Sequence, residues 1–175
     1  MWIRYCKISL VFSCGLFFAL VVLNNLTDYG SNFEFVENVL NMSTTFEGNA
    51  LMWRAIESPV IHHIFYGAII AWEATTMVLC FCAAYVLFRA RGGDAAAFDR
   101  AKPLAVVALT VGMLLWFVAF ITVGAEWFAM WQSPTWNGQN SAFRMFTIMG
   151  IILIFLSLPD SLHPLAEMDL SGKAT

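Results

Sequence analysis

The chain has 175 residues, of which 60% are hydrophobic and only 12% are charged. Soluble globular domains carry about 25% charged residues, so this composition argues against a soluble protein and favours one that lies in a lipid bilayer. The net charge of −3 and the absence of a basic cluster in the sequence argue against a nucleic-acid partner.

Four apolar segments are long enough to cross a membrane, which requires about 20 mostly apolar residues. The sequence therefore predicts an all-α polytopic membrane protein whose four transmembrane helices form a single bundle. The expected spans are residues 8–26, 60–88, 104–131 and 139–158. The first span follows Arg4 and Lys7 as a signal peptide would, but it ends in LNNLTDYG without a small-x-small cleavage site, and we expect it to be retained.

The segment 27–59 between the first two spans is too long for a plain connection. Apolar residues recur in it at helical spacing, with polar residues between them, at Phe33, Val36, Val39 and Leu40. This pattern predicts a short amphipathic helix at the membrane surface. A second short helix is expected over about 49–57, ending before Pro59.

Cationic residues indicate the orientation of the chain, because Lys and Arg are enriched in cytoplasmic loops. Seven of the nine lie on one side of the predicted spans: Arg4, Lys7, Arg89, Arg91, Arg100, Lys102 and Lys173. The termini, the middle loop 89–103 and the tail 159–175 are therefore expected to be cytoplasmic. Segments 27–59 and 132–142 are expected outside, with 27–59 forming an outer cap.

Glu73 lies within the apolar stretch IIAWEATTM of the second span. At a helical rise of about 1.5 Å per residue it lies roughly 22 Å from the cytoplasmic end of its span, close to the heights of Arg144 and Asn24. A charge at this depth usually pairs or lines a cavity. We expect Glu73 to pair with Arg144, with Asn24 or Asn25 completing the hydrogen bonds. The pair would form either a structural clasp or a site that binds a ligand or handles protons.

A second polar layer is expected near the outer interface, formed by His63 and Glu126 and by His62 and Tyr66. His63 and Glu126 could ligate a metal, but they are too few for a convincing site, and a hydrogen-bonded network is the stronger interpretation. The cysteines fall in or beside apolar spans and are interpreted as free thiols. No cofactor-binding motif is present in the sequence, and the cofactor stays unknown.

Longer segments of the chain, among them NNLTDYGSNFEFV, TTFEGNALMWRAI and GAEWFAMWQSPTWNGQNSAFRMF, together with IIAWEA and IFLSLPD, resemble a bacterial family of predicted small integral membrane proteins. The resemblance covers nearly the whole chain. It implies a four-helix protein of the bacterial inner membrane, and it supplies no activity and no site residues.

Three classes of function remain open from the sequence. The first is an accessory or assembly subunit of a larger membrane complex, suggested by the small size and the absence of a catalytic motif in the sequence. The second is a module that binds a quinone, a lipid or a metal near Glu73. The third is a small transporter or proton path, which would require self-association. An enzyme is the least favoured interpretation.

Overall fold

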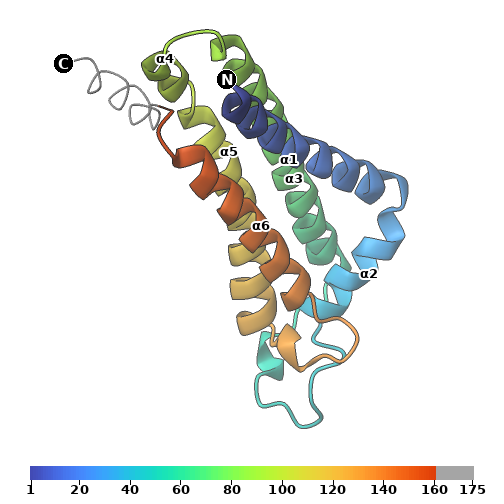
Figure 1. Cartoon of the computed structure of the whole chain (residues 1–175). Coiled ribbons are helices and arrows are strands. Elements are labelled where there is room, and N and C mark those ends of the chain that lie inside the picture. Colours follow the sequence, from blue (N-terminus) through green and yellow to red (C-terminus); the bar gives the residue numbers. More distant parts are fainter. Residues whose placement is uncertain (161–175) are drawn as a thin grey trace, which may run out of the picture.

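The computed structural model describes residues 1–160, which form helices and connecting loops without any strand. Four long helical segments run along the molecule (Figure 1). They are α1 (Trp2–Thr27), α3 (Pro59–Ala90), α5 (Pro103–Leu114) continued by the π-helix η2 (Leu115–Trp127), and α6 (Gln139–Ser157). All four are long and apolar enough to cross a membrane, which confirms the predicted four-helix membrane fold.

Local sequence explains where several helices begin. Pro59 and Pro103 each occupy the first turn of their helices, where the missing N–H is not needed and the fixed φ angle suits a helix. The short helix α4 (Ala95–Arg100) begins at Asp94, whose carboxylate accepts a hydrogen bond from the Ala97 backbone N–H at 2.6 Å.

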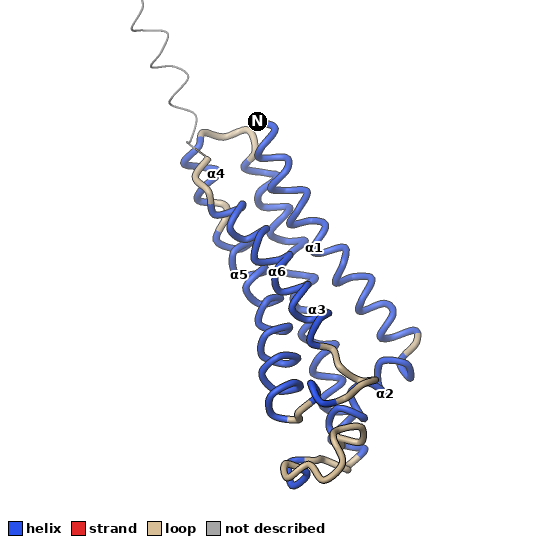
Figure 2. Tube along the Cα trace, turned by 60° about the horizontal axis from the view of Figure 1, so that its bottom comes forward, coloured by secondary structure: helices blue, strands red, loops and turns tan. Residues whose placement is uncertain are grey.

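Helix α3 packs between α1 and α5, and α6 packs against the third span. Helices α1 and α3 approach each other closely at Gly15, where an added Cβ would lie 3.0 Å from the Phe81 ring. Helix α1 then diverges from α6 toward α2 (Tyr29–Leu40), as both views show (Figures 1 and 2). The bundle is therefore closed at the end near the N-terminus and more open at the other end.

The open end is covered by α2 and two short 3-10 turns, η1 (Met52–Arg54) and η3 (Met130–Gln132), and we call it the cap end. Helix α2 buries Val39 and Leu40, as its amphipathic pattern predicts. The second predicted helix, 49–57, is reduced to the single turn η1. The Arg54 guanidinium there stacks on Trp53 and Trp127, which fixes the turn in place of further helical hydrogen bonds.

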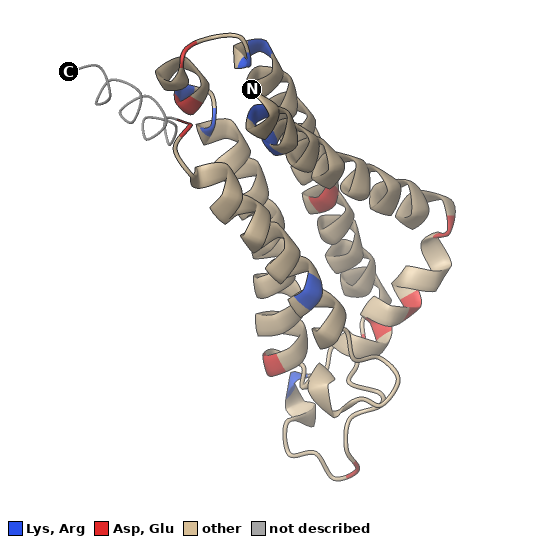
Figure 3. Ribbon diagram, in the orientation of Figure 1, with Lys and Arg blue, Asp and Glu red and all other residues tan. Residues whose placement is uncertain are grey.

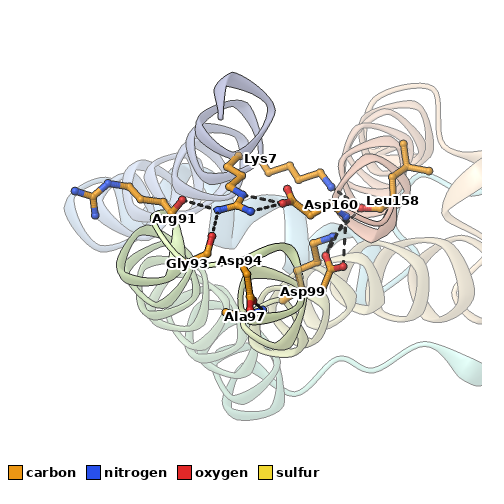
Figure 4. Close-up of polar contacts among 10 residues, drawn as sticks. Lys7, Arg91, Gly93, Asp94, Ala97, Asp99, Leu158 and Asp160 are labelled. Carbon is orange, nitrogen blue, oxygen red and sulfur yellow. Dashed lines mark hydrogen bonds and ion pairs between the residues drawn. The ribbon is translucent and has the colours of Figure 1, made fainter. Parts of the chain in front are cut away.

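The opposite end, which we call the terminal end, gathers most of the basic residues (Figure 3). The Arg4 guanidinium bonds the Asp160 carboxylate, with Nε to Oδ2 at 2.8 Å. Lys7 and Lys102 are both buried, and both donate to the Leu158 carbonyl just beyond α6, at 2.5 and 2.7 Å (Figure 4). Cations at a helix C-terminus offset its partial negative charge, so these contacts tie α1 and α5 to the end of α6.

Candidate functional site

Glu73 lies midway along α3 and is only 3% exposed. Its Oε2 accepts a hydrogen bond of 2.6 Å from the side-chain amide of Asn25, near the end of α1. The Asn25 oxygen in turn accepts from the Asn32 amide of α2 at 2.8 Å. A line of polar side chains therefore joins α2, α1 and α3 at the cap end, and we call these three residues the Glu73 cluster.

The expected ion pair between Glu73 and Arg144 is not formed. The Arg144 side chain is exposed, and the contact the structure gives it within residues 1–160 is to the Ser141 hydroxyl, at 3.3 Å. Glu73 and Arg144 lie at similar heights along the bundle, but equal height does not make two side chains face each other. The partner of Glu73 is Asn25, which comes from α1. Of the two asparagines considered, Asn25 is buried and Asn24 is exposed, as consecutive residues on a helix point about 100° apart.

The second predicted polar layer is divided among separate contacts. His63 is exposed, stacks on Phe33 with ring centroids 4.2 Å apart, and contacts the Tyr29 hydroxyl at 2.8 Å. The inward-facing histidine is instead His62, whose Nε2 lies 2.7 Å from the Ile56 carbonyl oxygen. Glu126 is exposed on the third span. Within residues 1–160, no three His, Cys, Asp or Glu side chains come together as a metal site would require.

A cavity of about 410 Å³ lies against the Glu73 cluster, between α1, α2, α3, η2 and the start of α6. Its volume falls in the range of about 300–1,000 Å³ that is usual for small-molecule sites. We call it the polar cavity, because carboxylate, amide and hydroxyl groups line it beside aromatic rings. The lining residues that the argument uses are Glu73, Asn25, Asn32, Trp116, Phe35 and Phe120.

Trp116 contributes part of its side chain to the lining of the polar cavity. The residue is 92% buried. Its indole Nε1–H is enclosed by the protein and has no hydrogen-bond partner within the described part of the chain, which costs about 1–3 kcal/mol. The Glu73 carboxylate, bonded through Oε2 to Asn25, supplies acceptor capacity in the same cavity.

The Trp116 side chain comes from an irregular part of the third span. Trp116 belongs to η2, a π-helix of 13 residues, and π-helical segments occur frequently at functional sites. Where α5 gives way to η2, the Trp72 indole N–H donates to the Val111 carbonyl at 3.0 Å. Sequence reasoning missed both Asn32 and Trp116. No pattern in the sequence marks a π-helix, and tryptophan in an apolar span usually indicates packing.

Polar side chains become sparse beyond Glu73 along the axis of the bundle. Toward the terminal end, the buried core that α1, α3 and α5 share is mostly apolar, with Phe18, Cys80 and Leu109 among its residues. Thr76, one turn from Glu73, is buried, but its hydroxyl donates to the Trp72 carbonyl of its own helix at 2.9 Å. Beyond it, the next buried polar side chains within residues 1–160 are the lysines of the terminal end.

The chain belongs to the family described as predicted small integral membrane proteins, whose model matches residues 3–159. This match confirms the resemblance found in the sequence. No curated protein and no solved structure matches the chain.

Proposed function

We propose that the protein is a membrane-embedded binding module that takes up an amphiphilic molecule from the bilayer. The observation that supports this proposal is the polar cavity, in which the Glu73 carboxylate, bonded to Asn25 through one oxygen, lies beside aromatic and aliphatic side chains. Sites for small molecules have this composition, with a few polar groups that orient the ligand in a mostly apolar pocket. A purely structural clasp would not require an open volume beside the carboxylate.

The alternatives receive less support from the geometry. A transmembrane proton path would need polar groups on both sides of Glu73, whereas the core toward the terminal end is apolar. An accessory subunit of a larger complex stays a prediction from the sequence and is compatible with a bound ligand. A metal-binding module would need His63 and Glu126 close together, and both are exposed at separate places.

The same proposal assigns the protein to the bacterial inner membrane, with both termini in the cytoplasm. The excess of Lys and Arg around the terminal end supports this orientation. The polar cavity would then lie in the outer half of the membrane and receive its ligand from the outer leaflet.

The test is a comparison of small molecules that copurify with the protein in native lipid particles. Wild type, Glu73→Gln and Asn25→Leu would be extracted and analysed by mass spectrometry. Glu126→Gln is the matched control, because it removes a carboxylate that is exposed and does not line the polar cavity. We expect one molecule at about 1:1 stoichiometry in wild type and in the control, and its loss in the two site variants. Equal lipid profiles in all four proteins would refute the proposal.

A further inference from the structure

The hydrogen bonds of the Glu73 cluster leave acceptors rather than donors for a ligand. A carboxylate oxygen accepts, so the Asn25 amide nitrogen faces Glu73 and the Asn25 side-chain oxygen accepts from Asn32. The Tyr66 hydroxyl donates to the Asn25 backbone carbonyl at 3.4 Å. Glu73 Oε1 receives no hydrogen bond within residues 1–160. It is also not among the enclosed unpaired atoms of that region, so a molecule the size of water reaches it.

The charge of the polar cavity has one sign. Glu73 is the one Asp, Glu, Lys, Arg or His among the described residues that line it. No ion pair formed within residues 1–160 includes Glu73, and Arg144 is turned toward the Ser141 hydroxyl on its own helix. A charge in the membrane interior is costly unless a partner compensates it. A cationic ligand would supply that compensation, whereas an anionic one would add a second negative charge.

Aromatic side chains in the lining favour the same sign of ligand. Trp116, Phe120 and Phe35 pack in sequence, with ring centroids 5.0 and 6.2 Å apart, and all three line the polar cavity. The electron-rich faces of such rings attract cations and repel anions. This aromatic wall and the Glu73 carboxylate therefore border one cavity and prefer the same charge.

Resting on the proposed function, we propose that the ligand is an amphiphile with a cationic ammonium head group, which lies beside Glu73. A hydroxyl head could also donate to Oε1, but it would leave the negative charge uncompensated in a region of low dielectric. The apolar part of the ligand lies in a second cavity of about 240 Å³, which we call the apolar cavity. The two cavities adjoin, since they share Phe35, Val36, Ile69 and Phe120 as lining residues.

The experiment titrates the full chain in neutral maltoside micelles with three probes and measures binding by native mass spectrometry. Decylammonium, decanol and decyl sulfate share one apolar chain and carry a cationic, a neutral and an anionic head. Glu73→Gln removes the charge and keeps the shape of the side chain. Glu126→Gln is the matched control, because Glu126 is exposed and lines neither cavity. Phe120→Leu removes one ring of the aromatic wall, and thermal unfolding checks that each variant is folded.

We expect wild type to bind decylammonium at least about tenfold more tightly than decanol, and decyl sulfate more weakly than either. Glu73→Gln should weaken decylammonium by at least about tenfold and change decanol by less than about threefold. Phe120→Leu should weaken decylammonium by about two- to fivefold, as the loss of one cation–π contact would. Glu126→Gln should leave all three affinities unchanged. If Glu73→Gln does not fold, the preference of wild type and the effect of Phe120→Leu still decide the question.

Equal affinities of wild type for decylammonium and decanol would overturn the cationic head group. A decylammonium affinity that Glu73→Gln leaves unchanged, or that Glu126→Gln lowers as much, would overturn the role of Glu73 as its counter-charge. The proposed function is judged separately by the molecule that copurifies with the protein. A neutral or anionic amphiphile that is lost in Glu73→Gln would overturn this inference and leave the proposed function intact.

Discussion

Asn25 is the junction of the Glu73 cluster, and its replacement by leucine tests how much the cluster stabilises the fold. The variant removes the 2.6 Å bond to Glu73 and the 2.8 Å bond from Asn32. A hydrogen bond to a charged group contributes about 1.5–3 kcal/mol, whereas interhelical bonds in membranes average about 0.6 and reach about 1.7 kcal/mol. Because Glu73 is almost fully buried, the upper membrane value applies, and we expect the free energy of unfolding to fall by about 1.5–2 kcal/mol.

The assay is reversible unfolding in bicelles, followed by circular dichroism or by a steric trap. Asn24→Leu is the matched control, because the Asn24 side chain is exposed and the structure gives it no hydrogen bond within residues 1–160. The control should change the free energy of unfolding by less than about 0.5 kcal/mol. Equal effects of the two substitutions would refute the reasoning, since they would show that the buried contact carries no specific energy.

Two further predictions concern helix packing and orientation. Gly112→Ala should lower the free energy of unfolding by about 1–2 kcal/mol, because its Cβ would collide with Met149 and lie 3.0 Å from Thr76. At Gly67 an added Cβ meets nothing within 4 Å, so Gly67→Ala should raise the free energy of unfolding by about 0.5–1 kcal/mol. Both variants are measured by the same unfolding assay, and a lower free energy of unfolding in both would contradict the packing. In a cysteine-free background, Glu47→Cys and Gly92→Cys should react with an impermeant maleimide from opposite sides of the membrane, with Gly92→Cys reacting from the cytoplasm. Labelling of Gly92→Cys from outside the cell would invert the proposed orientation.

The fold was predictable because its determinants are local in the sequence. Long apolar runs define the four helices, and Pro59 and Pro103 fix the starts of α3 and α5 to within a residue of the prediction. The amphipathic period of α2 likewise identified its buried face. Each of these signals depends on residues within a few turns of one another and needs no knowledge of how the helices pack.

The candidate site was predictable only in part, because its geometry depends on helix rotation and on the divergence of α1. The apolar surroundings of Glu73 correctly indicated that it needs a partner. The rise per residue gave the height of each candidate along the bundle but not the direction in which its side chain points. The sequence therefore could not decide between Arg144 and Asn25 as the partner of Glu73. The same ambiguity left open which of His62 and His63, about 100° apart on the helix, faces inward, and the structure buries His62.

The choice of an amide rather than a guanidinium as the partner of Glu73 links the stability of the fold to its proposed function. A bidentate arginine would neutralise the carboxylate and occupy its acceptor positions, whereas Asn25 donates through a single amide and leaves capacity for a ligand. Buried polar pairs are often no more stabilising than apolar residues of similar size. The free energy of unfolding of the double variant Asn25→Leu/Glu73→Leu should therefore lie within about 1 kcal/mol of that of wild type and above that of Asn25→Leu alone. The double variant should nevertheless bind no amphiphile. If that variant kept its ligand, the cluster would be a clasp that could be exchanged for an apolar one without functional loss.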